Sequence, residues 1–251
     1  MNKLYVKSEL CFSLVFIVLY IVGVSVCDMF SGMIGISNIF TLPFLLGLSL
    51  ILFFWIKNND LLKKYGLCKP NFSSKHFLFY IPLLFLISTN LLLGINLNLK
   101  FFDCVLSVLT MLCVGFVEEI IFRGFLFKAL AKDNVKSAII VSSVTFGLGH
   151  LVNLFSSGLD NLVPNVCQVF YAMAVGFLFV IMFHRGGSLI ACIITHSLVN
   201  MLSIFQNTQK LTMTFEIGTS IAIIVISIIY AIVLLKTLKE NNQIIEQNID
   251  E

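Results

Sequence analysis

Charged side chains are scarce in this sequence. Asp, Glu, Lys and Arg make up 12% of the 251 residues, whereas hydrophobic residues make up 59%. Because an average soluble domain has about 25% charged residues, this composition excludes an ordinary soluble protein and indicates an integral membrane protein. The formal net charge of +3 gives no reason to expect nucleic acid as a partner, and we expect none.

The usual sequence patterns of disulfide frameworks and zinc sites are also absent. The seven cysteines are odd in number, none forms a CxxC pair, and most fall inside apolar runs, where cysteine acts as a small hydrophobe. The HExxH pattern, in which two histidines on one helix face bind zinc, does not occur. The sequence therefore predicts neither a disulfide framework nor a cysteine-based metal site.

What the sequence has instead is a series of long apolar runs. Crossing a hydrocarbon core of about 30 Å takes about 17 to 25 apolar residues, and about eight runs approach or reach this length. They cover residues 10–27, 38–56, 76–94, 103–127, 137–153, 164–184, 187–205 and 215–236. The first run lacks a small-x-small cleavage site, so we interpret it as a retained helix rather than a signal peptide. We expect one all-α membrane domain over residues 1–251, with about eight transmembrane helices.

The positions of the basic residues predict the orientation of these helices. If the runs cross the membrane one after another, the segments that connect them lie on alternate sides. With Arg123 assigned to the side of the two termini, only Lys100 and Lys210 of the 16 Lys and Arg residues fall on the other side. Cytoplasmic segments of membrane proteins carry the excess of Lys and Arg. We therefore expect a multi-pass protein of the cell membrane with both termini in the cytoplasm.

The stretch "VEEIIFRGF" places three charges in the middle of the fourth run. Glu119 and Arg123 are four residues apart, so on a helix they face the same way and can form an ion pair. Glu118 points about 100° away from this pair and has no partner on its own helix. A carboxylate without a partner in a desolvated site has properties that suit a general base.

His150 closes the stretch "FGLGH", one helical turn after Phe146. Glu118 and His150 lie at equal distances in sequence from the turn near Asn134, so an antiparallel helix hairpin brings them to a similar depth. Glycines 147 and 149 allow close helix approach.

The stretch "THSLVN" in the seventh run adds His196 and Asn200. These two residues are also four apart and share one helix face. Ionisable groups inside a membrane are energetically costly, so the default hypothesis for this set is a functional site in a polar intramembrane cavity.

Two other interpretations of the same residues stay open at this point. The Glu119–Arg123 pair can be purely structural, with the histidines and Asn200 serving as hydrogen-bonded core residues between helices. Alternatively, Glu118, His150 and His196 can be three ligands of a catalytic zinc ion.

Taken together, these motifs resemble a known family. The order EExxxR (118–123), FxxxH (146–150), "GGSL" (186–189) and HxxxN (196–200) is similar to the CAAX-protease and bacteriocin-processing family, also called the Abi family. Its members are intramembrane glutamate peptidases. The resemblance spans a catalytic core of about residues 115 to 203, and the first hundred residues contribute only hydrophobicity.

The resemblance implies an intramembrane protease without a cofactor. Glu118 and His150 would hold and deprotonate a water molecule, while His196 and Asn200 would stabilise the oxyanion. Glu119, Arg123 and Phe146 would support these groups without touching the substrate. Because catalysis in this family depends on glutamate and not on a metal ion, the resemblance argues against the zinc interpretation.

The substrate class implied by the resemblance is a peptide or protein at the membrane. The eukaryotic branch of the family trims prenylated CAAX tails, but the Ile-, Lys-, Asn- and Phe-rich composition suggests an AT-rich bacterial source. A bacteriocin, a pheromone or a leader peptide is then the expected substrate. The alternatives are a self-immunity or scaffold protein without catalysis and, less well supported because we find no inverted repeats, a small-solute transporter.

Overall fold

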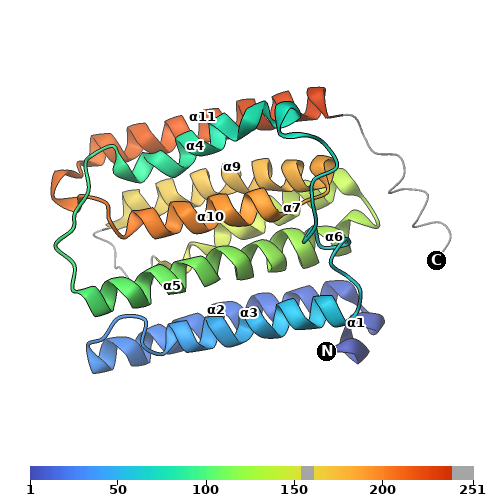
Figure 1. Cartoon of the computed structure of the whole chain (residues 1–251), viewed down its shortest axis with the longest axis horizontal. Helices are drawn as coiled ribbons and strands as arrows, with labels where there is room; N and C mark the ends of the chain where they lie inside the picture. The colour runs from blue at the N-terminus through green and yellow to red at the C-terminus, as the bar shows by residue number, and fades with distance from the viewer. Residues whose placement is uncertain (154–160, 239–251) are drawn as a thin grey trace.

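The chain folds as a bundle of helices that run roughly along one direction (Figure 1). The computed structural model describes residues 1–153 and 161–238. The α-helices in the described part are α1 (Asn2–Lys7), α2 (Glu9–Ile34), α3 (Thr41–Asn58), α4 (Ile81–Ser88), α5 (Phe101–Glu118), α6 (Phe127–Ala131), α7 (Val135–Gly149), α9 (Leu162–Gly186), α10 (Ile190–Ser203) and α11 (Met213–Thr237). A π-helix, η3 (Glu119–Leu126), joins α5 to α6, and short 3-10 helices occupy η1 (Ser74–Tyr80), η2 (Thr89–Leu91) and η5 (Thr208–Lys210).

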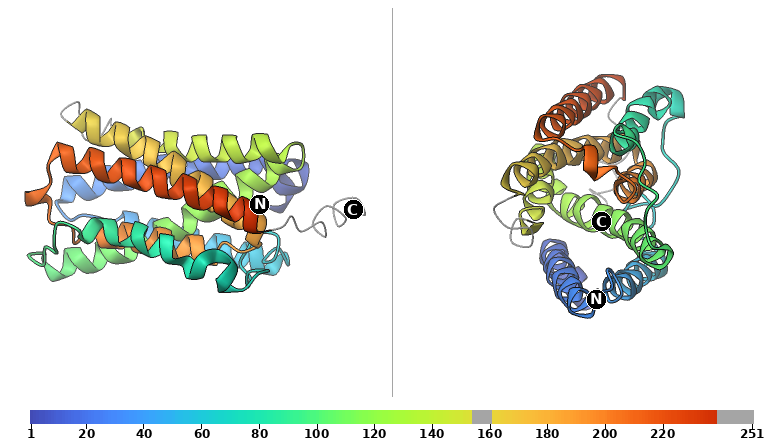
Figure 2. Two further views of the ribbon diagram at one scale, coloured as in Figure 1. Left: turned by 90° about the horizontal axis from the view of Figure 1, so that it is seen from above. Right: turned by 90° about the vertical axis from the view of Figure 1, so that its left-hand side faces the viewer.

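Some helices pack against their neighbours in the sequence, and others pack against helices that are distant in the sequence. Viewed end-on, the α2 and α3 pair lies on one side of the bundle and the α4 and α11 pair on the opposite side (Figure 2). Between them, α5 contacts both α3 and α10, while α9 contacts both α7 and α11. The π-helix η3 packs against α2, so the first long helix contacts the segment that contains Glu119 and Arg123.

Among the described residues, five helical segments are long and apolar enough to cross a membrane. They are Glu9–Ile34, Thr41–Asn58, Phe101–Ala131, Leu162–Gly186 and Met213–Thr237. Their outer faces carry exposed large apolar side chains; on α11, for example, Ile221 is 56% and Ile229 is 57% exposed. A large exposed apolar surface promotes aggregation in water, whereas in a membrane it can contact lipid. The all-α class and the multi-pass membrane protein are therefore confirmed.

The expected third transmembrane helix, 76–94, is not a continuous helix. Residues Leu78, Phe79 and Tyr80 have φ angles of 50°, 51° and 59°, which lie in the left-handed region and interrupt the helix. The helical segment α4 begins only at Ile81, next to Pro82, a residue that suits the first turn of a helix. The apolar run predicted a continuous crossing because hydropathy measures apolar length and not backbone continuity.

Two further expected crossings are helices that are shorter than the apolar runs that predicted them. Helix α7 (Val135–Gly149) and helix α10 (Ile190–Ser203) are apolar, but neither has the 18 residues of a full candidate span. The total of eight crossings therefore stays a prediction.

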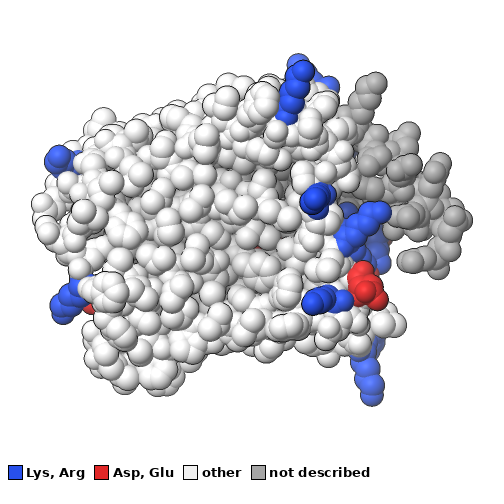
Figure 3. Space-filling view, in the orientation of Figure 1, with Lys and Arg blue, Asp and Glu red and all other residues white. Residues whose placement is uncertain are grey.

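Basic residues gather mainly at one end of the molecule. On the face shown in Figure 3, most Lys and Arg side chains lie at the end where α6 begins the turn to α7, and few lie at the other end. At this basic end Glu9 lies 2.6 Å from Lys64 Nζ and 3.0 Å from Lys132 Nζ. The hydrogen bond to Glu9 raises the pKa of Lys64 although burial opposes it.

Candidate active site

The predicted ion pair between Glu119 and Arg123 is present and fully buried. Arg123 Nη1 lies 3.0 Å from Glu119 Oε1, and both side chains are 0% exposed. The guanidinium of Arg123 lies 3.8 Å from the centre of the Phe146 ring, a cation–π contact that lends further stability to the charge. The pair therefore links η3 to α7 and places two opposite charges against each other within one helix.

Two of the three charges, Glu119 and Arg123, lie in a π-helix, where the sequence predicted a regular α-helix. A π-helix bonds residue i to residue i+5, and such segments occur frequently at functional sites. Glu118 is the last residue of α5 and Glu119 the first of η3. Ser142 of α7 donates a hydrogen bond of 2.9 Å to the carbonyl of Phe122, and so satisfies a backbone oxygen of η3 from a neighbouring helix.

His196 of α10 contacts both glutamates. Its Nδ1 lies 2.8 Å from Glu119 Oε1, and its Nε2 lies 3.4 Å from Glu118 Oε2. With Glu119 ionised in its pair with Arg123, its carboxylate only accepts hydrogen bonds, so the ring donates from Nδ1. This contact fixes the plane of the imidazole and leaves Nε2 on the side of Glu118.

A glycine allows α10 to come this close to α5. A Cβ added at Gly115 would lie 2.6 Å from the backbone nitrogen of Ser197, the residue after His196. Any side chain at position 115 would therefore push α10 away from α5 and carry His196 away from Glu118. The expected close approach at Gly147 is also present, with 2.8 Å from its Cβ position to the carbonyl of Val169. At Gly149 the expectation was wrong for the described part of the chain, because no atom of it lies within 4 Å of the Cβ position.

Glu118 has a hydrogen-bond partner that the sequence did not predict. Tyr20 of α2 donates to Glu118 Oε1 at 2.5 Å, across 98 positions of sequence. This partner comes from α2, so it does not contradict the expectation that Glu118 has no partner on its own helix, but it means that this oxygen is not left unpaired. The other oxygen, Oε2, is buried and makes no hydrogen bond within the described part of the chain.

Glu118 and His150 line the same cavity. The cavity has a volume of about 100 Å³, and α2, α7 and the junction of α5 with η3 form its walls. Its lining residues are Tyr20, Ile21, Val24, Ser25, Glu118, Phe122, Phe146, Gly149, His150, Val152 and Asn153. The similar depth of Glu118 and His150, expected from their equal spacing about the turn, is thus confirmed.

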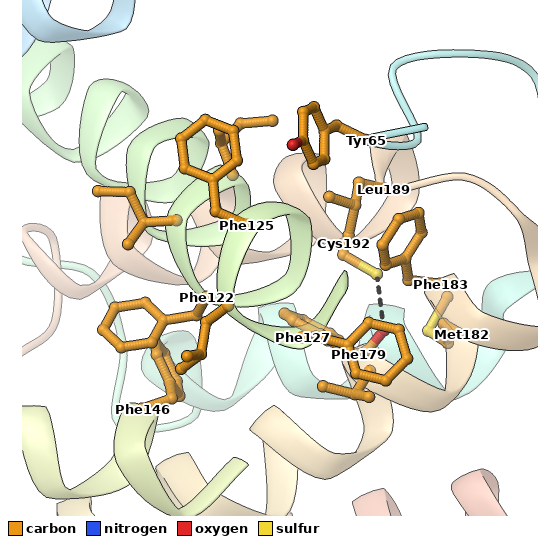
Figure 4. Close-up of a cluster of buried hydrophobic side chains, with 14 of the residues drawn as sticks. Tyr65, Phe122, Phe125, Phe127, Phe146, Phe179, Met182, Phe183, Leu189 and Cys192 are labelled. Atoms are coloured by element: carbon orange, nitrogen blue, oxygen red, sulfur yellow. Dashed lines mark hydrogen bonds between the residues drawn. The ribbon is translucent and has the colours of Figure 1, made fainter. Parts of the chain in front are cut away.

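Phe146 stands between the two histidines. Its ring meets His150 edge-on at 5.3 Å and His196 edge-on at 5.7 Å between ring centres. Figure 4 shows Phe146 beside Phe122 in a cluster of buried aromatic rings that extends to Phe179. These rings exclude water from behind the charged groups and limit the movement of the histidines.

Asn200 and the histidines differ in how closely they approach Glu118. Asn200 is half-buried on α10, one turn beyond His196, and does not line the cavity that Glu118 and His150 share. His196 does not line this cavity either, although its Nε2 lies 3.4 Å from Glu118 Oε2. Of the four predicted catalytic residues, the structure thus brings Glu118 together with each histidine and leaves Asn200 farther along α10.

Within residues 1–153 and 161–238, no group of three or more His, Cys, Asp or Glu side chains is arranged to hold a metal ion. The set Glu118, His150 and His196 considered for zinc lies within these residues, so the side-chain geometry does not support the zinc interpretation.

Comparison with known proteins gives one match. Residues 100–202 match the model of the family described as type II CAAX prenyl endopeptidase Rce1-like. The comparisons with curated proteins and with solved structures found no match. The matched stretch contains α5, η3, α7 and α10, which carry Glu118, His150 and His196.

Proposed function

Because residues 100–202 are a domain of the type II CAAX prenyl endopeptidase Rce1-like family, a family of proteases, we propose that this polytopic membrane protein hydrolyses a peptide bond within the membrane. The observation that carries the proposal is the buried carboxylate of Glu118, which borders a cavity with His150 and faces His196 at 3.4 Å. A carboxylate in this setting can act as a general base on a water molecule.

In the proposed reaction, Glu118 and His150 hold the attacking water. Glu118 removes one proton as the water oxygen bonds to the peptide carbonyl carbon, and the carbonyl oxygen becomes an oxyanion. The imidazolium form of His196, which carries a proton on Nε2 as well as on Nδ1, and the Asn200 amide donate hydrogen bonds that stabilise that oxyanion. The carbon–nitrogen bond then breaks and the proton held by Glu118 passes to the leaving amine, so that water is consumed and no cofactor is required.

Glu119, Arg123 and Phe146 serve the reaction indirectly. Glu119 fixes the His196 ring through Nδ1, Arg123 balances the charge of Glu119, and Phe146 limits where the guanidinium and both imidazoles can lie. We further propose that residues 115–203 are the catalytic core of a single membrane domain, 1–251. The basic end of the bundle supports an orientation with both termini in the cytoplasm.

We propose that the substrate is a peptide attached to or inserted in the bilayer. The family's description points to a prenylated CAAX tail, in which a lipid is bonded to the cysteine. The composition suggests a bacterial membrane, where a bacteriocin, a pheromone or a leader peptide is the more suitable class. Both classes present an extended peptide near a membrane anchor.

Cleavage by purified protein in lipid vesicles tests the proposal. A prenylated CAAX peptide and a synthetic bacteriocin leader peptide are each incubated with the protein, and mass spectrometry identifies the two fragments. We expect a new carboxyl terminus and a new amine from at least one peptide. Asn200→Ala should lower the rate about 10²- to 10³-fold by removing one oxyanion donor. His76→Ala, which changes an exposed histidine hydrogen-bonded to Ser73, is the control.

The same variants separate proteolysis from a role in self-immunity or as a scaffold. If cells expressing the protein resist a bacteriocin, and this protection persists undiminished in Glu118→Gln and His150→Ala, the protein acts by binding and the protease proposal is rejected.

A further inference from the structure

We propose that Tyr20 is a positioning residue for Glu118, and that α2 therefore completes an active site whose other members lie in residues 100–202. The inference rests on the proposed function, because it assigns Tyr20 a role in setting the reactive state of the proposed base. Tyr20 lies outside the stretch that matches the family, in the first hundred residues, where only hydrophobicity was evident from the sequence.

The first observation is the contact itself. The Tyr20 hydroxyl donates to Glu118 Oε1 at 2.5 Å, and the two residues are each 8% exposed. A hydrogen bond from a hydroxyl to an ionised carboxylate at this distance belongs to the strong, charge-assisted class. In a water-poor site it has little competition from solvent.

The second observation is that α2 is fixed at this place by its own packing. Phe12, Phe16 and Tyr20 follow one another at intervals of four residues and are all buried, so they form a single stripe on one face of α2. The rings of Phe12 and Phe16 lie 5.1 Å and 5.9 Å from the ring of Phe125 in η3. The contacts of this stripe with η3 thus fix the position of the Tyr20 hydroxyl relative to η3, the helix that follows Glu118.

The contact gives the two carboxylate oxygens of Glu118 different roles. Because the phenol donates to Oε1, the carboxylate plane is held and Oε2 is left as the acceptor without a hydrogen bond in the described structure. Oε2 is then the oxygen that can take a proton from water. A purely apolar ring at position 20 would leave the carboxylate free to rotate and to exchange the two oxygens.

The contact also stabilises the ionised form of the base. Donation of an O–H to a carboxylate favours its charged state, in which alone Glu118 can accept a proton. Several other titratable or charged groups surround Glu118 from the elements packed around it. They are His196 from α10, His150 from α7, and Glu119 and Arg123 from η3.

The variant Tyr20→Phe tests this role, because it keeps the aromatic ring in the stripe and removes only the hydroxyl. Tyr230→Phe is the matched control: Tyr230 is also buried and donates at 2.6 Å, but to the backbone carbonyl of Phe77 and away from Glu118. The measurement is the pH dependence of kcat and KM on a peptide that the wild type cleaves. Protein recovery and monodispersity in detergent are recorded for each variant.

We expect Tyr20→Phe to lower kcat about 10- to 100-fold, as loss of a hydrogen bond to a charged group implies, with KM little changed. The acid limb of the kcat profile should move toward higher pH, because the hydroxyl no longer stabilises the ionised carboxylate. Tyr230→Phe should leave the limb in place. Tyr20→Leu, which also lacks the hydroxyl, should shift the limb in the same direction.

A second measurement requires no substrate. Infrared difference spectra of wild type against Glu118→Gln isolate the carboxylic acid band of Glu118 during a pH titration, and Tyr20→Phe should raise the midpoint of that band. If the kcat profile and the infrared midpoint of Tyr20→Phe coincide with those of the wild type, the positioning role is wrong. If Glu118→Gln itself retains wild-type turnover, the proposed function fails instead, whatever Tyr20→Phe does.

Discussion

Replacing Arg123 with methionine should destabilise the protein far more than breaking any ion pair at its surface. Arg123 is 0% exposed, lies 3.0 Å from Glu119 Oε1 and stacks on Phe146. Methionine has a similar length, so Arg123→Met removes the charge with a small loss of volume. The carboxylate of Glu119 is then buried with His196 as its remaining partner. Removal of one partner of a buried pair costs about 3 to 5 kcal/mol.

The neutral double variant Glu119→Gln/Arg123→Met should recover most of this stability, since it buries no unbalanced charge. The assay is the recovery of monodisperse protein in mild detergent, followed by reversible unfolding. The control is Lys64→Met: Lys64 pairs with Glu9 at 2.6 Å, but its side chain is 31% exposed, so its removal should cost about 0 to 1 kcal/mol. Equal stability of Arg123→Met and Lys64→Met would refute the reasoning.

Three further outcomes follow from the packing, the charge distribution and the chemistry. Gly115→Ala should lower both turnover and stability, because it forces α10 away from α5. Gly218→Ala should change neither, because no atom of the described residues lies within 4 Å of its Cβ position. Reporter fusions should find residues 100 and 210 outside and residues 70 and 251 in the cytoplasm; an external residue 251 would overturn the orientation. A chelator should leave cleavage unchanged, and inhibition that added zinc reverses would establish a metal enzyme.

The local features of the site could be predicted from the sequence. The Glu119–Arg123 pair follows from helical spacing, and the shared cavity of Glu118 and His150 follows from equal spacing about one turn. Both depend on residues that are close along the chain or joined by a short hairpin. For such residues, helix geometry fixes the relative position before any tertiary contact forms.

The features that were missed depend on tertiary contacts or on backbone detail. Tyr20 meets Glu118 across 98 positions. The four-residue spacing of Phe12, Phe16 and Tyr20 marks one face of α2, but it does not indicate which helix that face meets. The π-helix from Glu119 and the break at Leu78–Tyr80 are likewise hidden, because hydropathy reports composition and not backbone hydrogen bonding.

The central claim is that the carboxylate of Glu118 activates water, and the turnover of Glu118→Gln tests it most directly. Glutamine keeps the shape and can still accept the Tyr20 hydrogen bond, but its amide cannot take a proton from water. Turnover should fall about 10²- to 10⁴-fold while peptide binding is retained. Glu216→Gln, in the first turn of α11, is the control and should cleave as the wild type does. A correctly folded Glu118→Gln that cleaves at the wild-type rate would contradict the account.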